Sequence, residues 1–181
     1  RTGPGVVLEA IGDAIGWAAP LQEALALAGI GTVEHAEVGA ITVALLPPGQ
    51  ASSEDSDQLA ALGLADPIIP VVIGSAASTL LADRSQIVRP ATALSEVAER
   101  IASLSRLGGA DLVAVNDLIS AARRWDAQGQ QSADLLSSSR TTAALPLAAL
   151  AASVNHADAG LVGEFARASA RLQTDQRRRR R

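Results

Sequence analysis

The sequence predicts an α/β protein: residues 6–107 are expected to form a small doubly wound parallel sheet, and an all-helical segment is expected to follow. Within this range, short apolar runs alternate with stretches in which apolar residues recur at helical spacing. The apolar runs are continuous instead of alternating with polar residues, as in parallel strands that helices cover on both faces. After Gly108 and Gly109 the strand-like runs stop.

Each expected strand is a short apolar or β-branched run bounded by turn residues. The strands are expected at residues 6–11, 32–37, 40–46, 67–74 and 85–90, and the helices of this region at residues 14–28, 54–64 and 94–107. Pro20 is expected either to kink the first helix or to lie in its first turn, because proline has no backbone N–H. Gly29 and Gly31 are expected to end that helix.

Three further helices are expected in the second part of the chain. The apolar face of the first consists of Leu112, Val115, Ile119, Ala122 and Trp125, and this helix is expected to end near Gly129. Residues 130–141 are polar and are expected to form a loop. A short helix over 143–154, interrupted by Pro146, and a helix over 160–176 are expected to follow.

These patterns divide the chain into three parts. They are an α/β domain over residues 1–107, a helical linker or adaptor over 108–176 and an Arg-rich tail over 177–181. A length of 181 residues fits one ordinary domain with such an appendage. No run approaches the roughly 18 continuous apolar residues that a membrane span needs. We expect a cytoplasmic protein, including one held at the cytoplasmic face of a membrane.

Charge and aromatic content disfavour nucleic acid as a partner. The net charge is −4, and all 15 basic residues are Arg. Five of these lie at residues 177–181, so the rest of the chain carries 10 Arg against 19 acidic residues and is poorly suited to bind phosphates. Aromatic residues make up only 2% of the chain, which leaves little material for stacking on bases.

Several site types are absent from the sequence or unsupported by it. There is no Cys, which excludes disulfides, thiolate metal sites and Cys nucleophiles. His35 and His156 have no further ligands at metal-binding spacing. Ser52, Ser53 and Ser75 lie outside any GxSxG motif and are interpreted as turn and cap residues. The chain contains no Met, so we interpret it as a fragment of a longer protein.

Four segments of the first part resemble a bacterial TIR domain. They are GWAAPLQEALALAGI (16–30), GAITVALLPPGQASS (39–53), ADPIIPVVIG (65–74) and QIVRP (86–90). Three segments of the second part, followed by the Arg run, resemble the helical region that follows TIR domains in certain bacterial proteins. They are AARRW (121–125), SADLLSSSR (132–140) and EFARASAR (164–171). The resemblance implies a flavodoxin-like sheet, and a membrane helix or WD40 propeller after the Arg run.

The resemblance also implies where a catalytic residue should lie, and the sequence departs from it there. Active TIR domains cleave NAD with a Glu in the helix after the third strand. The matching position in this chain falls at Gln58 or Leu59, and neither is a carboxylate. Glu54 and Asp57 lie nearby and are candidates for a displaced catalytic carboxylate. The alternative interpretation is that these two acids stabilise the N-terminus of the helix.

Two further features are candidates for partner contacts. Trp125 is either an exposed anchor for a partner or a core residue at the end of its helix. The run formed by Arg177, Arg178, Arg179, Arg180 and Arg181 has three interpretations: a solvated tail, the flank of a downstream membrane or propeller segment, or a phosphate-binding tail.

The sequence as a whole favours a signalling and protein-interaction module: a TIR-like scaffold domain of a larger bacterial sensor or defence protein, without its own catalysis. No cofactor is then expected, and the partners are other proteins or further copies of the chain. The alternative is an NAD+ hydrolase of the TIR type that uses Glu54 or Asp57 as its carboxylate. Loss of NAD and release of nicotinamide would distinguish the two.

Overall fold

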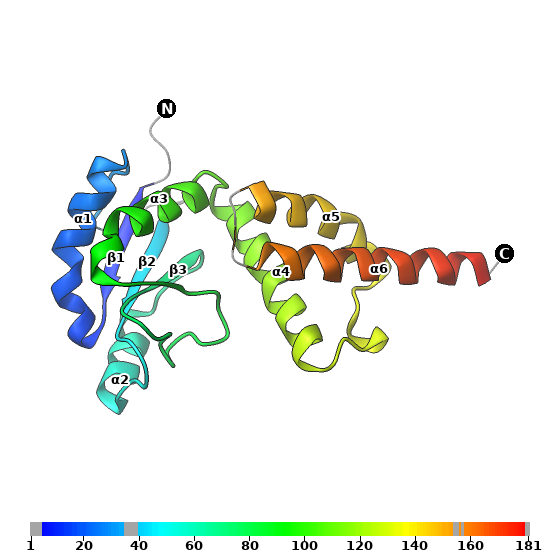
Figure 1. Cartoon of the computed structure of the whole chain (residues 1–181), viewed down its shortest axis with the longest axis horizontal. Coiled ribbons are helices and arrows are strands. Elements are labelled where there is room, and N and C mark those ends of the chain that lie inside the picture. Colours follow the sequence, from blue (N-terminus) through cyan, green and yellow to red (C-terminus); the bar gives the residue numbers. More distant parts are fainter. Residues whose placement is uncertain (1–4, 35–39, 154–155, 157, 180–181) are drawn as a thin grey trace. The chain divides into compact units, whose positions relative to one another are not determined.

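The chain divides into two units, which we call the front unit (Arg1–Val113) and the helical unit (Ala114–Arg181). The computed structural model describes residues 5–34, 40–153, 156 and 158–179, and it also leaves out the side chain of Ser138 (Figure 1).

The front unit contains a four-stranded, fully parallel sheet. Its strands are β1 (Val6–Ala10), β2 (Ile41–Leu46), β3 (Ile68–Ile73) and β4 (Ile87–Arg89), and they lie side by side in the order β1-β2-β3-β4. All six residues of β2 and all six of β3 are buried. Continuous apolar runs therefore form central parallel strands, which confirms the predicted α/β class.

Helices cover the sheet on both faces. Helix α2 (Ser53–Leu62) packs through Leu59 and Leu62 on a cluster that contains Ala44 and Leu46 of β2. Alternate residues of a strand point to opposite faces, so the intervening residues of β2 point away from α2. Helices α1 (Ala18–Leu27) and α3 (Leu94–Ser105) contact each other, and Figure 1 shows them together on the side of the sheet away from α2.

The predicted strand over 32–37 is not formed in its described part. Only Thr32 makes an isolated parallel bridge, with Val6 at the start of β1, and residues 35–37 lie outside the described residues. Val33 donates its N–H to the carbonyl of Val6 at 2.9 Å, so the chain here lies at the edge where β1 begins. The next strand starts at Ile41, opposite the same Val6. The few intervening residues are too short for the crossover that a second full parallel strand requires.

The first helix starts in a tighter conformation than its periodicity predicts. A 3₁₀ segment, η1 (Gly12–Trp17), precedes α1, and a second one, η2 (Ala91–Ala93), precedes α3. Pro20 is the third residue of α1, so the first-turn alternative is the one observed and no kink is needed. Gly29 follows the helix with φ +80°, a left-handed conformation that glycine adopts without steric cost.

Helices and one short 3₁₀ turn make up the second part of the chain. Its elements are α4 (Gly109–Ala127), the 3₁₀ turn η3 (Ser132–Asp134), α5 (Ser138–Ser153) and α6 (Ala159–Arg179). The predicted loop over 130–141 was too long, because α5 already begins at residue 138. Thr141 explains the early start: its N–H and its hydroxyl both donate to the carbonyl of Ser137 at 3.0 Å. Pro146 lies inside α5 without interrupting it, contrary to the prediction.

The core of the helical unit is built around two of the three aromatic residues of the chain. Phe165 of α6 is 0% exposed and Trp125 of α4 is 4% exposed. Their ring centroids lie 5.4 Å apart with the planes tilted by 48°, an arrangement that aromatic pairs prefer. Among the described residues, no helix combines the length and the apolar character that crossing a membrane requires.

Candidate functional site

The carboxyl ends of β1 and β2 and the start of α2 meet at one edge of the front unit. In open parallel α/β sheets this edge is the usual place for ligands, because the loops that leave the strands diverge there. In this chain β1 leads into Gly12, and β2 leads through Pro47, Pro48 and Gly49 into α2. The candidate carboxylates Glu54 and Asp57 both lie on α2.

The start of α2 is fixed by a capping box. The side chain of Ser52 accepts a hydrogen bond from the N–H of Asp55 at 3.1 Å, and Asp55 Oδ2 accepts one from the N–H of Ser52 at 2.9 Å. Two N–H groups that the helix itself leaves unsatisfied are thereby bonded. Asp55 is thus engaged in the structure of the helix end.

Gly12 joins the loop after β1 to the same helix. The N–H of Gly12 donates a hydrogen bond to Oε1 of Gln58 at 3.0 Å. Gly12 has φ +55°, and a Cβ added to it would overlap Oδ1 of Asp55. Only glycine meets both requirements, the left-handed backbone and the close approach of α2. The inward side of α2 at this edge is therefore occupied by an amide that bonds to the backbone.

The two candidate carboxylates lie on the exposed surface of this helix. Glu54 and Asp57 are exposed, and neither forms a hydrogen bond or an ion pair with any residue that the structure describes. Of the two positions at which the resemblance expects a carboxylate, Gln58 contacts Gly12 and Leu59 packs in the apolar cluster beneath α2. The structure thus brings Gln58 to the strand ends and leaves the nearby acids facing solvent.

A second polar centre at this end of the sheet was not expected from the sequence. Gln86 binds the turn formed by residues 78–81: its Oε1 accepts from the N–H of Ser78 at 2.8 Å, and its Nε2 donates to the carbonyls of Ser78, Leu80 and Leu81 at 3.0, 2.8 and 3.2 Å. Ser78 is itself 3% exposed. No local pattern around Gln86 marks it, because all its partners lie five to eight residues earlier in the chain.

The remaining residues singled out by the sequence are Ser75, His35 and His156. Ser75 is exposed in the loop after β3. His35 lies outside the described residues. His156 is 8% exposed, and its Nδ1 accepts a hydrogen bond from the N–H of Asp158 at 3.1 Å. Within the described part of the chain, no group of three or more potential ligands could hold a metal ion.

The two interaction candidates of the helical unit have different surroundings. Trp125 is a core residue, so the interpretation as an exposed anchor does not fit the structure. Helix α6 extends three residues beyond its predicted end, and its last turn contains the exposed residues Arg177, Arg178 and Arg179. Cations in the last turn of a helix stabilise the negative end of its dipole. Arg180 and Arg181 lie outside the described residues.

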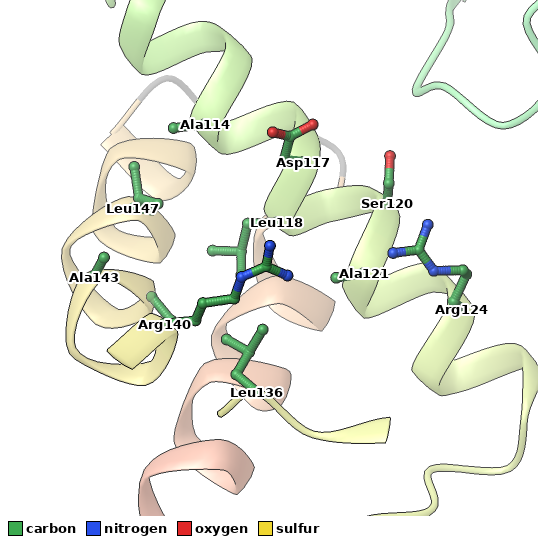
Figure 2. A pocket seen from close by; sticks show the side chains of 11 residues that line it. Ala114, Asp117, Leu118, Ser120, Ala121, Arg124, Leu136, Arg140, Ala143 and Leu147 are labelled. Atoms are coloured by element: carbon green, nitrogen blue, oxygen red, sulfur yellow. The ribbon is translucent and has the colours of Figure 1, made fainter. Parts of the chain in front are cut away.

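The helical unit also contains a groove that the sequence did not reveal. It lies between α4 and α5 and has a volume of about 470 Å³ (Figure 2). Leu118, Ala121 and Leu136 contribute apolar surface to it. Arg124 and Arg140 line it as well, and neither guanidinium forms a hydrogen bond or ion pair with the described side chains. The groove therefore combines an apolar floor with two cations and one anion, Asp117, which forms no ion pair with either arginine.

Comparisons with protein-family models, with curated proteins and with solved structures give no match for this chain. Its function is therefore inferred from its own residues and their geometry.

Proposed function

We propose that this chain is a signalling and protein-interaction module of the TIR type, whose front unit is a scaffold and not an NAD+-cleaving enzyme. One observation carries the proposal: at the strand ends the inward position on α2 holds Gln58, which is bonded to the backbone of Gly12. An amide cannot supply the negative charge that stabilises a ribosyl cation as nicotinamide leaves. The helix thus braces the loop after β1.

The arrangement of the strands supports the TIR-like part of the proposal. Thr32 bridges Val6 on the edge of β1 that faces away from β2. With this bridge counted as a rudimentary second strand, the spatial order becomes 2-1-3-4-5, the order of flavodoxin-like sheets. Only residues 34–40 separate Val33 from Ile41 in the sequence, fewer than the dozen or more that a helical crossover takes.

The exposed acids support a contact role over a catalytic one. Glu54 and Asp57 face solvent, where a carboxylate has no desolvated pocket in which to act on a developing charge. Exposed acids in the first turns of a helix stabilise its N-terminus and remain free to meet a cationic partner. The partners of this module are other proteins or further copies of the chain.

Incubation of the full chain with NAD+ tests the absence of catalysis. The protein is assayed at high concentration and also clustered on beads, and free nicotinamide is followed by chromatography. We expect no release above a protein-free control. Release that Glu54→Gln or Asp57→Asn abolishes, while the matched exposed variant Glu23→Gln retains it, would overturn the scaffold proposal in favour of a displaced carboxylate.

A further inference from the structure

The groove between α4 and α5 has a polarity along its length. In Figure 2, Ala114 and Leu147 lie at one end, while Leu136 and the two arginines Arg124 and Arg140 lie toward the other. Asp117 also lines the groove, nearer the end with Ala114. A ligand that matches this groove therefore carries its negative charge at one end and small apolar groups along the rest.

Helix α2 of the front unit has a face of this kind. Glu54 and Asp57 lie three residues apart, about one turn, and Ala60 and Ala61 continue the same side of the helix. All four are exposed, and the two carboxylates have no partner among the described residues. The hydrogen bond of Gln58 to Gly12 and the capping box fix the position of α2, and this face of the helix remains exposed.

The dimensions of groove and helix agree. On α4 the groove extends from Ala114 to Arg124, a rise of about 15 Å at 1.5 Å per residue. Helix α2 has ten residues and is therefore also about 15 Å long. Ala121 and Ala143 leave room for the close approach of a helix backbone.

The two units are also complementary in charge. Residues 1–113 contain five arginines and thirteen acidic residues, a net charge of −8. Residues 114–181 contain ten arginines and six acidic residues, a net charge of +4. The five arginines of residues 177–181 supply this positive excess, because residues 114–176 carry five arginines and six acidic residues, a net charge of −1. At the groove itself the positive charge comes from Arg124 and Arg140, and opposite charges on two surfaces favour one orientation over others.

We propose that the α4–α5 groove of one copy binds helix α2 of a second copy, with Glu54 and Asp57 placed against Arg124 and Arg140. The contact joins two different surfaces, so it is heterologous, and repeated contacts build an open chain of copies. This inference names the partner of the interaction module proposed above and rests on that proposal. It also gives Glu54 and Asp57 a role at a surface in place of a role in catalysis.

Complementary charge reversals of the full chain test this contact. The variants are Glu54→Arg/Asp57→Arg, which keeps the groove, and Arg124→Glu/Arg140→Glu, which keeps the acidic helix. Sedimentation velocity measures the mass of each variant over a range of concentrations, and circular dichroism checks that each remains folded. Arg167→Glu/Arg171→Glu, on exposed residues one turn apart on α6, is the matched control.

We expect the wild-type chain and the α6 control to self-associate, with an association constant that falls at least tenfold when salt is raised from about 0.05 M to about 0.5 M. Each charge-reversed variant alone should associate at least tenfold more weakly than the wild type. An equimolar mixture of the two should regain association beyond that of either variant alone. The acidic helix of one variant meets the arginines of the other's groove, and the reversed pair, an arginine-bearing helix against a glutamate-bearing groove, is complementary as well.

Two results would overturn the inference. One is a wild-type chain that stays monomeric at every concentration. The other is charge-reversed variants that associate as strongly as the wild type or the α6 control. The NAD+ assay tests the scaffold proposal separately. A chain that does not self-associate and does not release nicotinamide would contradict the docking inference and leave the scaffold proposal intact.

Discussion

The N–H of Gly12 and Oε1 of Gln58, separated by 46 positions in the sequence, lie 3.0 Å apart and form a hydrogen bond. The bond joins the loop after β1 to helix α2 at the carboxyl edge of the sheet. Gln58 is one of the two positions at which the proposed TIR resemblance would place a carboxylate, and Glu54 and Asp57 on the same helix are exposed. Both the scaffold proposal and the docking inference depend on this arrangement of α2.

Removing the acceptor should destabilise the front unit. Gln58→Ala leaves the Gly12 N–H without its partner, and we expect a loss of about 1–2 kcal/mol in the free energy of unfolding. Urea denaturation followed by circular dichroism measures this change. Asp57→Ala, an exposed change on the same helix, should stay within about 0.5 kcal/mol of the wild type. Equal losses in the two variants would contradict a specific role for the Gln58 amide.

The amide group of Gln86 should be required for the stability of the turn at residues 78–81. Gln86→Ala removes one acceptor and three donated bonds from the turn at residues 78–81, so we expect faster amide hydrogen exchange there and a loss of about 2–3 kcal/mol.

The isosteric variant Gln86→Glu separates shape from hydrogen bonding in the same experiment. A carboxylate keeps the size of the side chain but cannot donate to the carbonyls of Leu80 and Leu81. We therefore expect Gln86→Glu to be as unstable as Gln86→Ala at neutral pH. Wild-type exchange rates in this variant would show that the donated bonds are dispensable.

The aromatic pair should dominate the stability of the helical unit. Phe165→Ala empties a fully buried site beside Trp125, and we expect a loss of about 3–5 kcal/mol. Near-ultraviolet circular dichroism during urea unfolding follows the packing around Trp125. The matched control is Leu145→Ala on α5, where the side chain is 47% exposed and the cost should be below about 1 kcal/mol.

Trp125→Phe should cost less than Phe165→Ala. The indole Nε1–H of Trp125 is buried and has no acceptor among the described residues, so the smaller ring removes an unsatisfied donor while it loses some apolar contact. The same unfolding measurement compares the two variants. A larger loss in the free energy of unfolding for Trp125→Phe would show that the packing of the indole ring outweighs the cost of its unsatisfied N–H.

Periodicity and turn residues were sufficient to predict most of the elements. Four of the five expected strands are formed, and Gly29 and Gly129, both with positive φ, follow the helices that they were expected to end. These features depend on residues close together in the chain. The strand expected at residue 32 failed in its described part because the chain must cross from one side of β1 to the other and begin β2 at Ile41, a constraint that no local pattern contains.

The sequence by itself determined which segments are strands and helices, because apolar spacing and backbone preference act over a few residues. It also indicated that neither Gln58 nor Leu59, the two positions on α2 where the resemblance expects an acid, is a carboxylate. Only the tertiary structure decided what that amide does, that Trp125 is buried against Phe165, and that Arg124 and Arg140 line one groove. Each of these depends on segments far apart in the chain, whose approach is set by the packing of the whole unit around its core.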